Sequence, residues 1–169
     1  MKQVSVTIIS NTKLLPDFTH PQGKTLLGSY LMWLNCPEIA QEAKPGQFVM
    51  VRCGEDCLLP RPFSIHQING GTLALFFAVL VGGKGTNWLA QREPGVQLEI
   101  FGPLGNGFTI NRASKNLLAV AGGIGIAPLY LLVQDALAKG CAVKLLLGAQ
   151  TASQLYHHHL LPQGVELLT

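Results

Sequence analysis

Apolar side chains in the first part of the chain recur in short runs with a period of two, which is the pattern of half-buried β-strands. Glycine, proline and asparagine separate these runs, and Asn69-Gly70-Gly71 is typical of a tight hairpin. A short helix is expected over Asn87–Gln91. The six expected strands are Val4–Ile9, Tyr30–Leu34, Phe48–Val51, Pro62–Ile65, Leu73–Leu80 and Val96–Phe101. Strands of this number and length favour a six-stranded antiparallel Greek-key barrel.

The pattern changes in the last third of the chain. Leu117–Ala121 is a continuous apolar run, which predicts a strand covered on both faces. Pro128–Lys139 then predicts a helix with proline in its first turn. A second buried strand, a short helix and a third strand are expected over Val143–Leu147, Ser153–His159 and Val165–Leu168. This β-α-β-α-β order predicts the opening of a parallel nucleotide-binding sheet.

The change of period divides the chain into two expected domains. The first is a β-barrel over residues 1–111, and the second is a partial nucleotide-binding α/β domain over residues 112–169. Three parallel strands make an incomplete sheet, and the outer strand would present an open edge. The sequence is therefore interpreted as truncated at its C-terminal end, within the second domain.

The composition fits a globular protein. Hydrophobic residues make up 48% of the chain and charged residues 12%, which argues against disorder. The net charge of +3 comes from scattered Lys and Arg, so we expect no nucleic acid partner. Asn116–Gln134 is uncharged, but its glycines and Pro128 favour a turn over a membrane span. The start of the chain lacks the pattern of a signal peptide, and we expect a cytoplasmic protein.

Three short strings carry candidate chemistry, and the first is Arg61–Ile65 at the start of an expected barrel strand. A flavin dinucleotide needs a cation for its pyrophosphate, and Arg61 offers a forked, permanently charged set of donors. Phe63 offers an aromatic face for the flavin ring, and Ser64 offers a polar group near the ring edge. The structural alternative is an edge strand that happens to contain Pro62.

The second string, Val81–Thr86, follows a strand and precedes the short helix. Its glycines would let backbone N–H groups approach a phosphate closely. Thr86 could cap the helix and bond the same phosphate. The string lacks the Gly-Lys-Ser/Thr ending of a P-loop, and a plain turn with a helix cap is the alternative.

The third string, Ala121–Leu129, joins the first buried strand of the second domain to its main helix. Its glycines would permit a tight turn and the close approach of a dinucleotide phosphate. Pro128 stands where the usual fingerprint has a third glycine, and the next strand ends without a carboxylate for a ribose. A structural strand–turn–helix is the alternative. The residues of this string expected to contact NAD are Gly122, Gly123, Gly125 and Pro128.

Together and in this order, the three strings resemble the ferredoxin-reductase-like flavoproteins. The resemblance extends over essentially the whole chain and is closest to the electron-transfer subunits of type B dihydroorotate dehydrogenases. Three further strings are typical of those subunits, namely Pro45–Phe48, Gly102–Phe108 and Leu147–Ala149.

The resemblance implies an oxidoreductase subunit that binds FAD and reduces NAD in pyrimidine biosynthesis. In this family the flavin receives electrons from a partner subunit, which oxidises dihydroorotate at an FMN, through a 2Fe–2S cluster. A hetero-oligomer is therefore expected, and no side chain is expected to act as a general acid or base. The residues implied to contact FAD are Arg61, Pro62, Phe63, Ser64, Ala78, Val79, Leu80, Gly85 and Thr86.

The chain departs from the family in its cysteines. The family carries four clustered cysteines in its later part, and nothing corresponding stands in this sequence. Cys36, Cys53, Cys57 and Cys141 are spread over barrel and sheet segments, so we expect free thiols and no iron–sulfur cluster or other metal site in this chain. Three consecutive side chains on a helix point in different directions, so His157–His159 is expected to be a solvated helix end.

Two other interpretations stay open at this stage. The chain could belong to another reductase of the same build, such as a ferredoxin-NAD(P) reductase or a sulfide-dehydrogenase-like complex. It could also be a fragment without catalytic function, whose exposed apolar surface only docks a partner. Flavin retention by the folded protein separates the second of these from the others.

Overall fold

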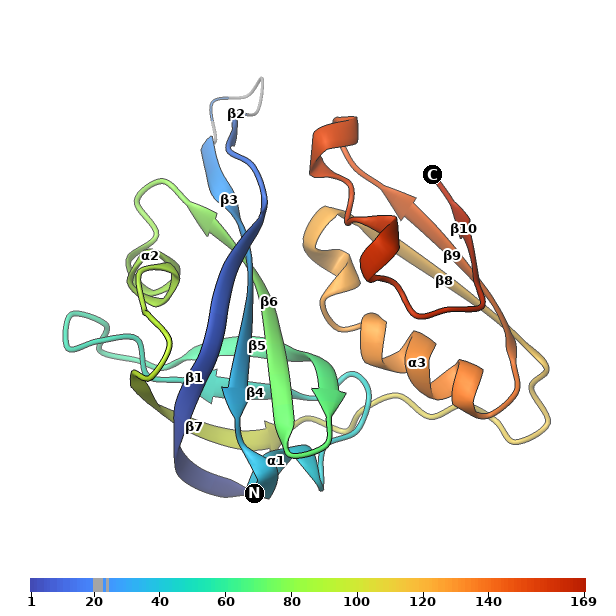
Figure 1. The fold of residues 1–169 in the computed structure, drawn as a ribbon, viewed down its shortest axis with the longest axis horizontal. Coiled ribbons are helices and arrows are strands. Elements are labelled where there is room, and N and C mark those ends of the chain that lie inside the picture. The colour runs from blue at the N-terminus through green and yellow to red at the C-terminus, as the bar shows by residue number, and fades with distance from the viewer. Residues whose placement is uncertain (20–22, 24) are drawn as a thin grey trace.

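The computed structural model of the chain describes residues 1–19, 23 and 25–169, and it has two parts that lie side by side (Figure 1). The strands are β1 (Lys2–Leu15), β2 (Phe18–Thr19), β3 (Thr25–Asn35), β4 (Phe48–Val51), β5 (Arg61–Asn69), β6 (Thr72–Leu80), β7 (Gln97–Leu104), β8 (Asn116–Gly122), β9 (Ala142–Gly148) and β10 (Val165–Leu168). The α-helices are α1 (Pro37–Ala40), α2 (Lys84–Ala90) and α3 (Tyr130–Ala138). Three short 3₁₀ turns are formed by Gly123–Ile126, Ala152–Gln154 and His158–Leu160.

The first part is a closed antiparallel barrel, as the period-two pattern predicted. Its strand order is β1-β7-β4-β5-β6-β3-β2, and β1 also pairs with β3. The first half of β1, from Lys2 to Thr7, pairs with β7, and the second half pairs with β3 as far as Leu15. The length of β1 therefore closes the sheet on itself, because the strand pairs with both β7 and β3.

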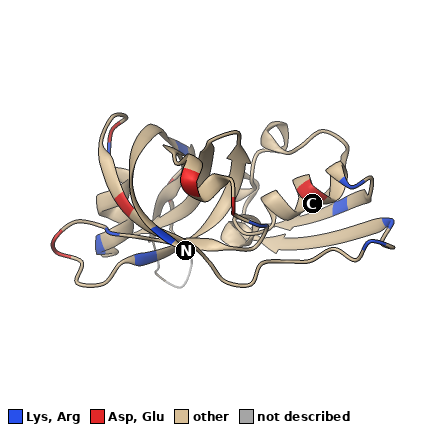
Figure 2. Cartoon of the chain, turned by 90° about the horizontal axis from the view of Figure 1, so that it is seen from below, with Lys and Arg blue, Asp and Glu red and all other residues tan. Residues whose placement is uncertain are grey.

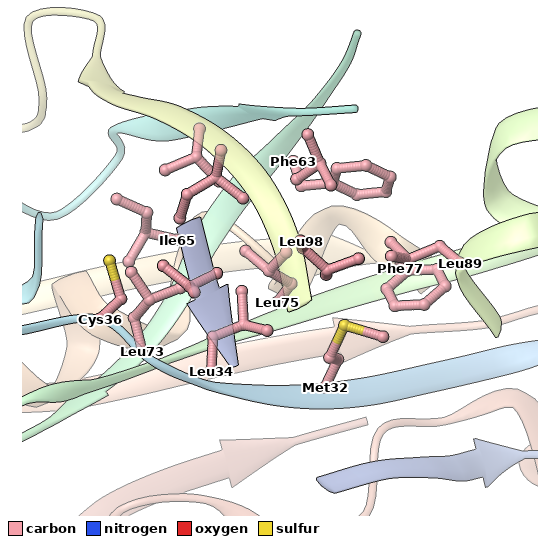
Figure 3. Close-up of a cluster of buried hydrophobic side chains, with 14 of the residues drawn as sticks. Met32, Leu34, Cys36, Phe63, Ile65, Leu73, Leu75, Phe77, Leu89 and Leu98 are labelled. Atoms are coloured by element: carbon pink, nitrogen blue, oxygen red, sulfur yellow. The ribbon is translucent and has the colours of Figure 1, made fainter. Parts of the chain in front are cut away.

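The barrel is held together by alternate side chains that point inward from its strands. Phe63 and Ile65 of β5 lie against inward residues of β6 and β3 in this cluster (Figure 3). Leu89 of α2 is also fully buried and packs into the same cluster. Burying a side chain of this size stabilises the fold by about 1.5–3 kcal/mol. The core thus fixes the register of every strand that carries a candidate site residue.

The second part is a parallel sheet of three strands in the order β10-β9-β8. Helix α3 packs on one face of β8 and β9 and also contacts β5 of the barrel. The opposite face is open, since Leu118 and Val120 of β8 are 65% and 60% exposed. The prediction that Leu117–Ala121 is covered on both faces is therefore wrong, because α3 covers only the side that carries Ala119 and Ala121.

Several expected boundaries shift, each for a local reason. Helix α2 begins at Lys84 rather than Asn87, because the extended residue Gly83 starts it. The 3₁₀ turn after β8 delays the main helix, so α3 begins at Tyr130, after Pro128. The helix expected over Ser153–His159 is replaced by two 3₁₀ turns on either side of Tyr156.

The connection between the two parts runs from Leu104, where β7 ends, to Asn116, where β8 begins. The expected domain boundary between residues 111 and 112 falls inside this connection and stays a prediction. Charged residues are dispersed along the ribbon of both parts (Figure 2). Within the described part of the chain, no helix has the length and apolar character needed to cross a membrane.

Candidate functional site

The two barrel strands that carry the predicted flavin residues separate from each other at one end. β5 and β6 are paired from Asn69 opposite Thr72 as far as Ile65 opposite Leu75, and the pairing stops there. Beyond that point Arg61–Ser64 pairs only with β4, and Ala78–Leu80 lies only beside β3. Each strand therefore presents one row of backbone N–H and C=O groups to the opening, and such groups require partners. An extended ligand that accepts and donates hydrogen bonds fits between them.

The first turn of α2 borders this opening beside Arg61. A Cβ built on Gly85 would lie 3.0 Å from Arg61 Cγ and 3.3 Å from Cys53 Cβ. Any larger residue at position 85 would therefore require the Arg61 side chain to shift, and Arg61 is exposed. A permanent cation and the backbone of Gly85 thus lie next to each other, an arrangement that suits recognition of a diphosphate.

The structure corrects the capping role expected for Thr86. The residue at the start of α2 is Gly83, and no side chain caps it, while Thr86 lies within the first turn. Asn87 holds the turn instead, because its amide donates to the carbonyls of Leu80, at 2.9 Å, and Gly83. Thr86 therefore stays a predicted phosphate contact only.

The side chains of Phe63 and Val79 point away from the opening, into the barrel core. Phe63 is 6% exposed, and its ring meets that of Phe77 edge-on, with centroids 5.5 Å apart. The stacking face expected of Phe63 is therefore turned inward, because Phe63 and Ile65 of β5 both belong to the barrel core. Phe63 and Val79 can present only backbone groups, whereas Ser64 and Ala78 are half-buried on the outer face.

A cavity of about 510 Å³ lies between the barrel and the parallel sheet. On the barrel side it is lined by Ser29 and Ala78, which are paired on β3 and β6. On the other side are Gly122 and Gly148, at the carboxyl ends of β8 and β9. Ligands of open α/β sheets bind outside the carboxyl ends of the strands. This cavity therefore joins a predicted FAD residue to predicted NAD residues.

The glycine-rich loop leaves open space on the cavity side. A Cβ on Gly122 or Gly123 would meet nothing within 4 Å, and one on Gly125 would meet only Ala121 Cβ, at 3.9 Å. Gly123 has φ of 50°, the left-handed region that favours glycine. Pro128 lies between the 3₁₀ turn and α3, without contributing to the cavity wall. The loop can thus approach a ligand with its backbone.

Sequence reasoning missed His66, which joins the two parts of the molecule. It is fully buried on β5 and contacts the carbonyl oxygen of Ala127 and the hydroxyl of Tyr156. A lone histidine in a strand gives little signal, and its partners are 61 and 90 residues away in the sequence. The one signal in the sequence was that His66 stands two residues after Ser64, since alternate residues of a regular strand share a face.

The cysteines and the histidine triplet are not brought together. All four cysteines are free and buried, and burial raises the pKa of the Cys53 thiol to about 11, so that it stays protonated near neutral pH. His158 and His159 are exposed on a 3₁₀ turn, rather than at the end of an α-helix. Among residues 1–19, 23 and 25–169, no group of three or more His, Cys, Asp or Glu side chains is placed to hold a metal ion.

Comparison with known proteins places the chain beside a group of redox subunits. No family model matches the chain. It is 48% identical over 126 residues to the electron transfer subunit of dihydroorotate dehydrogenase B (NAD(+)) from Desulforamulus reducens, with 72% of this chain and 47% of the relative covered. The subunit of the same name from Shouchella clausii is 32% identical over 160 residues, with 92% and 58% covered. The chain thus spans about half the length of these curated relatives.

Solved structures share the fold. An NADH-dependent reduced ferredoxin-NADP oxidoreductase superposes with a TM-score of 0.79 at 28% identity, over 96% of this chain and 55% of that chain. The ferredoxin reductase of carbazole 1,9a-dioxygenase has a TM-score of 0.78 at 18% identity, over 99% and 49%. The barrel followed by a parallel sheet is therefore the ferredoxin-reductase-like arrangement.

Proposed function

Because this chain is a homologue of the electron-transfer subunits of dihydroorotate dehydrogenase B, we propose that it holds FAD and passes electrons between that flavin and NAD. The observation that carries the proposal is the convergence of three predicted contacts around one opening. Arg61–Ser64, Ala78–Leu80 and Gly85 come from separate parts of the sequence and border the space between β5 and β6.

Each wall of the opening has a distinct task in this proposal. Arg61 and the amides of the first turn of α2 would hold the pyrophosphate. The unpaired backbone edges of β5 and β6, with the Ser64 side chain, would orient the flavin ring toward the cavity. Bound FAD supplies a group that exchanges electrons singly or as a hydride. No side chain of the chain is assigned a proton-transfer role.

The cavity supports a meeting point for the second cofactor. Gly122 and Gly123 line the cavity and would let a pyridine nucleotide approach from the carboxyl edge of the parallel sheet, with Gly125 in the same loop and Pro128 fixing the chain direction into α3. The described residues that line the cavity are uncharged, and most of its wall is apolar. Such a wall suits two flat rings and excludes water from between them.

The partner and the wider reaction are proposed from the relatives, since the chain spans about half of their length. We propose that the electrons come from a catalytic dehydrogenase subunit with an FMN that oxidises dihydroorotate, in a cytoplasmic hetero-oligomer. The 2Fe–2S relay expected in the full-length family has no cysteine group in this chain, so no step is assigned to it here.

A second candidate function rests on the fold comparison with the ferredoxin-NADP oxidoreductase at 28% identity. In that case the flavin would exchange electrons with a ferredoxin instead of a dihydroorotate-oxidising subunit. Reduction of the FAD-loaded chain by each type of reduced partner separates the two functions. Only the true partner should reduce the flavin at a rate that saturates with partner concentration.

The test of the flavin site compares two arginines. Arg61→Ala is expected to weaken FAD binding by roughly 1.5–3 kcal/mol, or about 10- to 150-fold in the dissociation constant, through the loss of a charge-assisted contact. Arg52→Ala is the matched control, because Arg52 is exposed and pairs with Glu99 at 3.7 Å on the outside of the barrel. Equal FAD affinity in the two variants would refute the assignment of Arg61.

A further inference from the structure

The protonation state of His66 follows from its two neighbours. Nδ1 lies 3.0 Å from the carbonyl oxygen of Ala127, which can only accept a hydrogen bond, so Nδ1 carries the proton and donates. Nε2 lies 3.0 Å from the hydroxyl of Tyr156 and accepts from it. The Tyr156 oxygen in turn accepts from the amide of Gln67, at 3.4 Å. Every polar atom of the imidazole is satisfied while the ring is neutral.

Aromatic rings enclose this hydrogen-bonded chain. The His66 ring lies 4.7 Å from that of Tyr130 and 5.3 Å from that of Phe76, measured between centroids. Tyr156 meets Phe76 edge-on at 5.2 Å. These side chains come from both the barrel and the second part of the chain. A neutral histidine is therefore buried at the junction, where a hydrogen bond is stronger than it is in water.

The junction lies directly behind the walls of the cavity. Ser64 precedes His66 by two positions on β5, and Ala127 follows Gly125 of the glycine-rich loop by two. Tyr156 follows Gln154, which lines the cavity and donates to the backbone of Pro16 at 3.1 Å. One imidazole thus ties together the flavin strand, the glycine-rich loop and the segment after β9.

We infer that His66 is a positioning residue, which fixes the nucleotide loop at Ala127 relative to the flavin strand at Ser64. The inference deepens the proposed function and rests on it. Hydride transfer needs the two reacting rings held at about 3–3.5 Å, and a displacement of about 1 Å can lower the rate by two orders of magnitude. The Ala127 and Tyr156 contacts restrain that separation without touching either ring.

The first test uses the protein without cofactors and measures hydrogen exchange. The amides of Ala127 and Leu129 bond to Ile124 and Ile126 and report on the loop. His66→Phe keeps a ring but loses both polar contacts, and it should raise exchange at these amides about tenfold. His66→Asn retains a donor at the Nδ1 position and should restore most of the protection. Tyr130→Phe is the control, because its hydroxyl bonds Leu160 and lies outside the chain of contacts.

The second test loads the same variants with FAD and follows flavin reduction by NADH. His66→Phe should bind FAD with wild-type affinity but be reduced about 10- to 100-fold more slowly at saturating NADH, with His66→Asn between the two. Unchanged loop exchange, or a loss of FAD affinity equal to the loss in rate, would overturn the inference. If His66→Phe fails to fold, His66→Leu, which also loses both polar contacts, takes its place in both tests. If the wild-type chain does not bind FAD, the proposed function is refuted but the inference is not. The hydrogen-exchange experiment still decides whether His66 restrains the loop.

Discussion

Gly85 lies directly beside the Arg61 side chain although the two residues belong to different elements, since a Cβ on Gly85 would stand 3.0 Å from Arg61 Cγ. Arg61 is the first residue of β5, and Gly85 lies in the first turn of α2. Their contact joins two of the sequence strings into one site. It also explains why glycine is needed at a position whose backbone angles would accept any residue.

Gly85→Ala should therefore impair FAD binding without unfolding the barrel. The added methyl group would press on Arg61 and on Cys53 Cβ, and the exposed arginine side chain is the one that can move. We expect FAD affinity to fall about tenfold, because the guanidinium is displaced rather than lost. Titration of FAD followed by flavin fluorescence measures this, with the thermal midpoint as the control for folding. Wild-type affinity in Gly85→Ala would contradict the contact's role.

Gly125→Val should block the pyridine nucleotide and spare the flavin. A Cβ at Gly125 meets only Ala121 Cβ, at 3.9 Å, so the fold has room for it, whereas the remaining methyl groups would occupy the space above the loop. NADH binding, measured by quenching of flavin fluorescence, should weaken at least about tenfold. Loss of FAD from this variant would mean that the two loops do not serve separate ligands.

Acid should weaken the junction between the two parts through His66. Burial lowers the pKa of His66 from 6.5 to about 4. The unfolded chain binds this proton below about pH 6.5 and the folded chain only below about pH 4, so the stabilisation is complete above pH 6.5 and is lost as the pH falls toward 4. Over that window the slope approaches about 1.4 kcal/mol per pH unit. The facing groups, Tyr130 and Tyr156, stay neutral there because burial raises the pKa of both.

Urea unfolding at several pH values between 4 and 7 measures this slope for the wild type and for His66→Asn. Other titrating groups contribute equally to both proteins, so the difference between the slopes belongs to His66. A variant that keeps the full wild-type slope would show that His66 is not neutral in the folded protein.

Polar substitutions on the open face of the parallel sheet should cost little. Leu118 is 65% exposed, whereas Leu145 on the neighbouring strand is fully buried beneath α3. Leu118→Thr should change the free energy of unfolding by less than about 0.5 kcal/mol, as surface substitutions do. Leu145→Ala should lower it by about 2–5 kcal/mol. A large loss in Leu118→Thr would mean that this face is covered in solution.

The sequence predicted the barrel well because its strands obey a single local rule. Inward and outward side chains alternate, and the six expected strands correspond to β1, β3, β4, β5, β6 and β7. The prediction that both faces of β8 are covered was wrong, because a continuous apolar run has the same sequence pattern whether the second face of the strand is covered or open. Leu118 and Val120 carry no local signal that distinguishes the two cases.

The candidate site was predictable in its residue strings but not in its orientation. The identity of Arg61 and the glycines indicated phosphate chemistry, whereas the inward turn of Phe63 depends on the register of β5 against its neighbours. His66 could not be found, since its two partners become neighbours only when the parts pack together. Long-range packing of this kind leaves no trace in local sequence periodicity.

An absorption spectrum of the chain purified without added cofactor, repeated after reconstitution with FAD, tests the flavin site most directly. We expect oxidised-flavin bands, with FAD rather than FMN released on denaturation. A folded protein that stays colourless after reconstitution would contradict the flavin site and would favour a fragment that only docks a partner.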